Sequence, residues 1–308
     1  MLVARLIAFG MPRSGRIALA GRPNVGKSSL LNALVGEHLA LVSRKAQATR
    51  LPVTGLRTEG DVQYVFHDLP GLLDPEYALQ ERMRALALEG IAQADVILFL
   101  HPAPEAPAPE LARLARLETA PRAPVLTVYT KGDLVPAARQ NELARDGLVV
   151  SAATGAGLDA LLAAIRERLP EREFAYPEDE LGTQPLRFFA VEFLREAAFE
   201  QLEDELPYAF TAEIEEFRES TDPVYIRAAL FIERESQKGI LIGEGGRTLK
   251  AIGKHARERL EQLIGRRVFL ETWVKVLPKW RRDPAQLRRF GFPDSDGAGR
   301  KGPGSPAS

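Results

Sequence analysis

A glycine-rich stretch near the start of the chain has the spacing of a phosphate-binding loop. Residues Gly21 to Ser28 read GRPNVGKS, which fits the pattern GxxxxGK[ST] between an apolar run and a helical stretch. Glycines let successive backbone N–H groups curve around phosphates, while Lys27 can reach the β and γ oxygens and Ser28 can bind Mg²⁺. The loop predicts a nucleoside triphosphate site. We expect contacts from Gly21, Asn24, Val25, Gly26, Lys27, Ser28 and Ser29.

Two later segments bear on which base this site selects. Thr130-Lys131-Gly132-Asp133 follows an apolar run and resembles the guanine motif NKxD, with Thr in place of Asn. The Asp133 carboxylate can accept hydrogen bonds from the N–H edge of guanine. Ser151-Ala152-Ala153 follows another apolar run, as does the loop that braces the base through backbone N–H groups in GTPases. In this order the segments favour GTP and GDP over ATP.

Two segments between these motifs are candidate switch loops. Asp68-Leu69-Pro70-Gly71 resembles DTPG, so we expect Asp68 to hold Mg²⁺ through water and Gly71 to present an N–H to the γ-phosphate. Residues 43–50 lie where switch I belongs, with Thr49 as the candidate ligand of Mg²⁺ and the γ-phosphate. A solvated basic loop is the alternative for that segment. Leu72 stands where many GTPases carry a water-orienting Gln, so catalysis is expected from positioning and charge by Lys27, Thr49 and Gly71.

Composition limits the classes of protein that remain. The 308 residues predict about two domains, and the absence of Cys excludes disulfides, a thiol nucleophile and thiolate metal sites. No apolar run approaches the length of about 18 residues typical of a transmembrane helix, so we expect a cytoplasmic protein. Residues 171–234 hold 17 acidic and 6 basic side chains (net −11), whereas 235–290 hold 6 and 14 (net +8). The basic stretch is a candidate polyanion surface or a solubilising face.

The periodicity predicts how the chain is organised. Strand patterns at 16–20, 64–68, 96–101, 125–130 and 148–151 alternate with helical patterns at 28–35, 80–92 and 158–168. This alternation predicts a doubly wound, mostly parallel α/β domain over residues 1–172. The proline-rich segment 101–110 is expected to be an extended surface loop, and 173–186 has the composition of a linker.

The remainder predicts an α+β domain over residues 187–290 and a disordered tail over 291–308. A helix at 186–202 precedes strands at 210–218 and 224–233, a glycine-interrupted helical stretch at 236–263 and a strand at 267–276. The order is α–β–β–α–α–β. Within it, Gly243-Glu244-Gly245-Gly246 fits the GxxG loop of a type II KH domain, which clamps about four nucleotides of a single strand. An ordinary helix–turn–helix is the alternative.

Basic and apolar side chains around this loop are candidate RNA contacts. Ile240 and Ile242 could pack against bases or fill the core, and the tract 279–282 (KWRR) could stack on a base or touch a phosphate. The predicted RNA-binding residues are Lys238, Ile240, Ile242, Gly243, Glu244, Gly245, Gly246, Arg247, Lys250, Lys254 and Arg257.

These motifs together resemble the Era family of GTPases. The shared features are GRPNVGKSSLLN, a TR-containing switch I, DxPG with an apolar next residue, the serine–alanine loop and a KH domain with ERESQKG, over about residues 15–282. The resemblance implies GTP hydrolysis with Mg²⁺, and stimulation by K⁺ that Asn24 helps to hold. It implies binding of the single-stranded 3′ end of small-subunit ribosomal RNA and a role in assembly of the small ribosomal subunit.

We also expect a monomer without a DNA partner and, at most, weak peripheral association with the inner face of the membrane through the basic C-terminal stretch. Glu244 departs from the family because a Lys is common there, so its contact with phosphate is expected to be weaker. A tRNA-modifying GTPase of the same branch is the first rival, but it predicts a C-terminal Cys or another appended domain. An RNA-binding scaffold with a vestigial pocket is the second, which measurable turnover would exclude.

Overall fold

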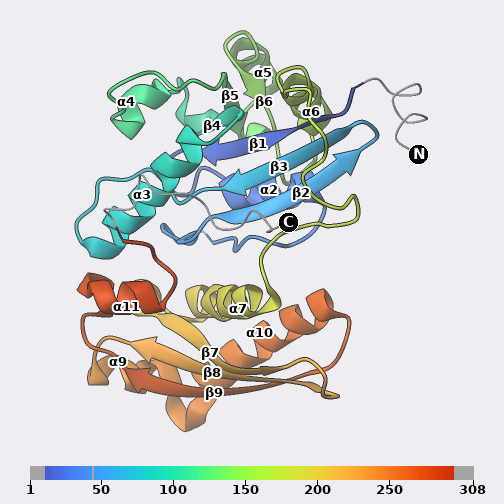
Figure 1. Ribbon diagram of the computed structural model, residues 1–308. Helices are drawn as coiled ribbons and strands as arrows, with labels where there is room; N and C mark the ends of the chain where they lie inside the picture. Colours follow the sequence, from blue (N-terminus) through green and yellow to red (C-terminus); the bar gives the residue numbers. More distant parts are fainter. Residues whose placement is uncertain (1–10, 44, 295–308) are drawn as a thin grey trace.

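The computed structural model describes residues 11–43 and 45–294, which form two sheets with their own helices (Figure 1). The first sheet has the order β2–β3–β1–β4–β5–β6, and every pair in it is parallel except β2–β3. Its strands are β1 (Arg13–Ala20), β2 (Val53–Glu59), β3 (Val62–Asp68), β4 (Val96–Pro102), β5 (Val125–Thr130) and β6 (Leu148–Val149). The prediction of a doubly wound, mostly parallel sheet is confirmed.

In the described part of the chain, five α-helices cover this sheet, whose central strands are apolar on both faces. Every residue of β4 is buried, as expected of a parallel strand covered on two sides. The helices are α2 (Lys27–Val35), α3 (Ala78–Ala92), α4 (Leu111–Ala115), α5 (Ala137–Leu143) and α6 (Leu158–Arg166). The loops that follow β1, β3 and β5 leave the sheet at one edge, which is where an open α/β sheet binds its ligand.

The edge strand β2 is absent from the strands that the sequence predicts. It pairs antiparallel with β3, and Gly55 interrupts the apolar pattern along it. That glycine is required by packing, since a Cβ there would lie 2.7 Å from side-chain carbons of Leu31 and Val35 on α2. The close approach of helix and strand therefore removes the pattern by which such a strand is recognised.

The second sheet has the order β7–β8–β9, with β7–β8 antiparallel and β8–β9 parallel. Its strands are β7 (Thr211–Arg218), β8 (Val224–Ile232) and β9 (Val268–Val276), and its helices are α7 (Leu186–Gln201), α8 (Leu206–Ala209), α9 (Glu235–Ile242), α10 (Arg247–Ile264) and α11 (Pro284–Arg289). The predicted α–β–β–α–α–β order is confirmed, with α8 and α11 as additional short helices. Figure 1 shows α7 between the two sheets.

Residues 173–186, the predicted linker, run along the first sheet. The Gln63 side chain accepts from the backbone N–H of Ala175 at 2.9 Å and donates to the carbonyl oxygen of Tyr176 at 2.8 Å. Further along, the N–H of Leu56 donates to the carbonyl oxygen of Leu181 at 2.8 Å. The segment thus covers the open edge of β2 while it connects the two halves of the chain. The domain bounds themselves stay a prediction.

Two expectations about loops are wrong in the structure. The segment 101–110 does not begin as an exposed loop, because His101 and Pro102 complete β4 and Ala103 is buried. The predicted disorder does not begin at Gly291, because Phe292 is buried beside Trp280 and Leu287 and Asp294 pairs with Arg82 at 2.9 Å. Residues 295–308 of the predicted tail lie outside the described residues.

His67 on β3 makes stability depend on pH. Its Nδ1 lies 3.2 Å from the Thr54 hydroxyl, and its Nε2 is buried without a partner among the described residues. Burial, with a smaller contribution from Arg16, lowers its pKa from 6.5 to about 4. The unfolded chain therefore binds a proton between these pH values that the folded chain does not. We expect the free energy of unfolding to fall by up to about 3 kcal/mol as the pH drops from 6.5 to 4.

Urea unfolding of the unaltered protein and of the His67→Gln variant across this range measures the effect. Other groups titrate in both proteins, so the difference between them isolates His67. The variant should lose less stability on acidification than the unaltered protein does. Parallel losses in the two proteins would show that His67 titrates normally in the folded state.

Candidate nucleotide pocket and RNA surface

The glycine-rich loop joins β1 to α2 in a left-handed path. Asn24 and Gly26 have φ values of 62° and 94°, and Lys27 is the first residue of α2. The Lys27 ammonium is buried and donates to the carbonyl oxygen of Arg22 at 2.9 Å. Burial lowers the pKa of Lys27 to about 8, and the nearby Asp68 carboxylate opposes that shift. The loop therefore holds its cation at the start of the helix, as a phosphate site requires.

The three predicted Mg²⁺ ligands come together although they are far apart in the sequence. Ser28 Oγ donates to Asp68 Oδ2 at 2.6 Å, and Thr49 Oγ1 lies 3.1 Å from that same oxygen and 3.0 Å from Ser28 Oγ. Asp68 is fully buried, and burial raises its pKa while Lys27 and the two hydroxyls oppose the shift. Its Oδ1 is buried with no hydrogen-bond partner among the described residues. An unsatisfied carboxylate oxygen beside two hydroxyls fits a hard cation such as Mg²⁺.

The segment after Asp68 packs directly on the phosphate loop. A Cβ at Gly71 would lie 2.7 Å from the backbone nitrogen of Pro23, so only glycine fits there. The N–H of Leu72 donates to the carbonyl oxygen of Gly21 at 2.9 Å, and the side chains of Leu69 and Leu72 are both buried. Leu72 therefore points into the core, where it cannot orient a water molecule. Leu69 fills the space beside Gly90 on α3.

The predicted base-binding residues form a connected set at the end of β5. Asp133 Oδ1 accepts from the Ser151 hydroxyl at 2.5 Å, and Lys131 Nζ donates to the carbonyl oxygen of Asn24 at 2.9 Å. Thr130 is buried and its hydroxyl donates to the carbonyl oxygen of Val25 at 2.6 Å. Thr130 thus fastens the phosphate loop to β5. Ala152 and Ala153 continue the Ser151 loop on the surface.

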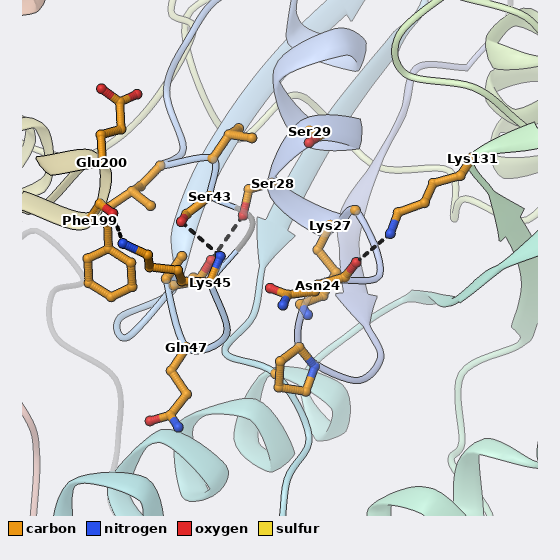
Figure 2. Close-up of a pocket in the computed structure, with 17 residues that line it drawn as sticks. Asn24, Lys27, Ser28, Ser29, Ser43, Lys45, Gln47, Lys131, Phe199 and Glu200 are labelled. Carbon is orange, nitrogen blue, oxygen red and sulfur yellow. Dashed lines mark hydrogen bonds between the residues drawn. The ribbon is translucent and has the colours of Figure 1, made fainter. Parts of the chain in front are cut away.

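A cavity of about 680 Å³ opens above the phosphate loop (Figure 2). Lys27, Ser28, Thr49 and Gly71 line it, whereas Asp133 and the Ser151 loop lie outside its lining. Sequence reasoning overlooked several lining residues. Ser43, Lys45, Gln47 and Ala48 of the lining belong to the segment predicted as switch I, and the overlooked residues are Leu41, Val42, Phe199 and Glu200. The last two belong to α7, and no local pattern signals a contact across some 150 positions of the chain.

Switch I is fastened to the C-terminal half by basic side chains. Lys45 Nζ donates to the carbonyl oxygens of Phe199, at 2.6 Å, and Leu202 at the end of α7. Arg195 on α7 donates to the carbonyl oxygen of Ala48 at 2.7 Å. Residue 44 of this segment lies outside the described residues. A movement of switch I would therefore change its hydrogen bonds with α7.

Arg50, at the end of switch I, makes the most extensive of these contacts. Its guanidinium is buried and donates to the carbonyl oxygens of Phe210, Tyr208 and Pro207 at 2.8, 2.9 and 3.2 Å. It also lies over the Trp280 ring, 5.5 Å from its centroid. One side chain thus satisfies three carbonyl groups at the end of α8.

The GxxG loop joins α9 to α10 through left-handed glycines. Gly243, Gly245 and Gly246 have φ values of 73°, 60° and 79°, and a Cβ at Gly243 would lie 2.4 Å from the Thr248 hydroxyl. Glu244 pairs with Arg247 at 2.6 Å. The negative charge that departs from the family pattern is therefore matched by a neighbouring cation.

The predicted RNA-contacting side chains surround this loop. Ile240 is 56% exposed and lies outside the core, while Leu241 beside it is buried. Lys250 is exposed, Lys254 forms an exposed pair with Glu258, and Arg257 is partly buried one turn further along α10. Trp280 of the KWRR tract is fully buried, so the expectation that it could stack on a base is wrong.

The fold and the two sites define a P-loop GTPase joined to a KH domain. The family model described as 50S ribosome-binding GTPase matches residues 16–131, and the KH domain model matches 205–281. GTPase Era of Geobacter metallireducens is 38% identical over 91% of this chain and 98% of its own, and that of Pseudomonas aeruginosa is 40% identical over 92% and 96%. The chain belongs to the Era family and is a GTPase.

Two solved structures resemble most of the chain. Era in complex with MgGDPNP and nucleotides 1506–1542 of 16S ribosomal RNA has a TM-score of 0.86 and 37% identity, covering 91% of this chain and 99% of that one. A variant of Aquifex aeolicus Era bound to GDP and AlF₄⁻ gives the same values. Membership in the family is thus supported by sequence and by structure.

Proposed function

We propose that this GTPase binds the single-stranded 3′ end of small-subunit ribosomal RNA through its KH domain and acts in assembly of the small ribosomal subunit. The RNA in the complex of the related Era supports this partner. The observation that carries the proposal is the attachment of switch I to α7 and α8, since it places the nucleotide-sensitive loop on the RNA-binding half. The nucleotide then controls RNA binding through the arrangement of the two halves.

The residues of the pocket take the roles that the motifs predict. Lys27 and the loop N–H groups hold the phosphates, while Ser28, Thr49 and Asp68 would hold Mg²⁺, which supplies charge neutralisation for phosphoryl transfer when bound. Gly71 would present its N–H to the γ-phosphate, and Asp133 would read the base. Because no side chain among the described residues is placed as a general base, turnover would depend on positioning and electrostatics, and intrinsic hydrolysis would be slow.

We further propose that K⁺ stimulates hydrolysis through Asn24, whose left-handed backbone places it at the rim of the pocket. Steady-state GTP hydrolysis, measured in matched K⁺ and Na⁺ buffers, tests the stimulation by K⁺ and the role of Asn24 in it. Faster turnover in K⁺, reduced in an Asn24→Ala variant, is the expected result. Equal rates in the two buffers would remove the K⁺ role, and no turnover in either would favour the scaffold reading.

The bounds 1–172, 173–186 and 187–290 are proposed as the domains and their linker. A monomeric state and peripheral contact with a membrane likewise stay predictions, tested by light scattering and by sedimentation with anionic vesicles. No helix of the described part of the chain is long and apolar enough to cross a membrane.

A further inference from the structure

A second cavity, of about 740 Å³, lies where the segment before α3 meets the C-terminal end of the KH domain. Tyr77 forms one wall, and Glu233, Lys279, Arg281 and Arg282 line the other. The Arg281 guanidinium lies 5.1 Å from the centroid of the Tyr77 ring and pairs with Glu233 at 2.5 Å. The cavity therefore exists only because the two halves of the chain are docked.

A turn anchored by Trp280 carries the basic residues Lys279, Arg281 and Arg282 of this cavity. Trp280 points inward, fully buried, and its Nε1 donates to the carbonyl oxygen of Ala209 at 2.8 Å. Lys279 has a φ of 54°, and its carbonyl oxygen accepts from the N–H of Arg282 at 2.8 Å. Because the tryptophan anchors the turn, Lys279 and Arg282 are exposed at the cavity, and Arg281 between them is partly buried. The turn therefore fixes the backbone positions from which Lys279 and Arg282 extend.

The residues that line this cavity carry a net positive charge. Arg234, Lys279, Arg281 and Arg282 stand against Glu76 and Glu233, and Glu233 is already paired with Arg281. Among the described residues no ion pair engages Lys279 or Arg282. Such uncompensated cations at a preformed cavity suit the phosphates of a nucleic acid backbone.

The cavity also continues the RNA surface of the KH domain. Arg234 is the residue before α9, and α9 ends at the GxxG loop. A helix of eight residues spans about 12 Å, so the cavity and the loop lie at opposite ends of one short element. A GxxG loop engages only about four nucleotides, which leaves a longer strand free to reach the cavity.

We propose that this cavity binds backbone phosphates of the same RNA strand that the GxxG loop clamps, through Lys279, Arg282 and Arg234. The inference rests on the proposed RNA-binding function and adds a second contact to it. Because Tyr77 donates its hydroxyl to Gln47 of switch I at 3.2 Å, an RNA that fills both sites favours the docked arrangement that orders this contact. An RNA long enough to reach both sites should therefore bind more tightly than a short one, and its affinity should depend more strongly on the bound nucleotide.

Titration of two RNAs with the Lys279→Ala and Arg282→Ala variants tests this proposal. One RNA spans nucleotides 1506–1542 of 16S ribosomal RNA, as in the related complex, and the other is a strand of about four nucleotides measured by competition. Each variant should bind the long RNA about tenfold more weakly, with the slope of log affinity against log salt reduced by about 0.7 per lost contact. Affinity for the short strand should not change.

Arg267→Ala is the matched control, because Arg267 is an exposed arginine of the same domain that lies outside both RNA sites. Circular dichroism verifies that all variants fold. Losses no larger than that of the control would overturn the proposal. So would weaker binding to the small ribosomal subunit with unchanged binding to naked RNA, since a protein would then occupy the cavity. If the unaltered protein binds neither RNA, the proposed RNA-binding function fails too. Failure of the cavity proposal alone is therefore distinguishable from failure of the proposed function.

Discussion

The Lys27→Ala variant is expected to bind GTP at least about 100-fold more weakly than the unaltered protein. The Lys27 ammonium is buried at the start of α2, where it donates to the carbonyl oxygens of Gly21 and Arg22 in the phosphate loop. Alanine removes a charge-assisted contact with the β and γ oxygens in a site of low dielectric constant, where such contacts contribute about 3 kcal/mol. Titration with a fluorescent guanine nucleotide measures this loss directly.

Lys275→Ala is a suitable control for this experiment, because Lys275 pairs with Glu215 on the second sheet, away from the pocket. It should bind nucleotide as the unaltered protein does. Thermal unfolding checks that Lys27→Ala folds, which we expect, since its substitution removes a buried charge. Unchanged nucleotide affinity in a folded Lys27→Ala variant would contradict the assignment of the phosphate loop.

The Arg50→Met variant should uncouple the two halves of the chain. Methionine keeps most of the apolar volume but leaves the carbonyl groups of Pro207, Tyr208 and Phe210 without their donor. Removing one partner of a buried polar cluster of this kind costs about 3–5 kcal/mol. We expect thermal unfolding to split into two transitions and any stimulation of hydrolysis by RNA to be lost, while nucleotide affinity changes little.

Arg84→Met separates this effect from general destabilisation. Arg84 donates to the carbonyl oxygens of Leu73 and Ala115, both within the first domain. Its loss should lower stability by a comparable amount while stimulation by RNA persists. If Arg50→Met responds to RNA as Arg84→Met does, the contact of switch I with α8 plays no part in coupling.

Much of this fold could be predicted because its signals are local. The glycine-rich loop, the strand before it and the GxxG loop each depend on residues within about ten positions, so periodicity and turn chemistry suffice. The meeting of Ser28, Thr49 and Asp68 could be predicted for a related reason. Each belongs to a motif that, in an α/β sheet of this order, lies at the same edge of the sheet.

Features that depend on distant contacts could not be predicted. Phe199 and Glu200 enter the nucleotide pocket from α7 only because Lys45, Arg50 and Arg195 bind α7 and α8 to switch I. Trp280 is an aromatic residue in a basic tract, which is typical of an RNA contact. It is nevertheless buried, and its Nε1 donates to the carbonyl oxygen of Ala209. Composition alone cannot distinguish a side chain that anchors a turn from one that binds a ligand.

We propose that nucleotide and RNA act on one another through the contact between switch I and the KH domain. Steady-state GTP hydrolysis in K⁺ buffer, with and without a single strand that copies the 3′ end of small-subunit ribosomal RNA, tests it most directly. We expect the RNA to accelerate GTP hydrolysis. Hydrolysis that proceeds at the same rate with and without saturating RNA would show that the two sites are independent, and would contradict it.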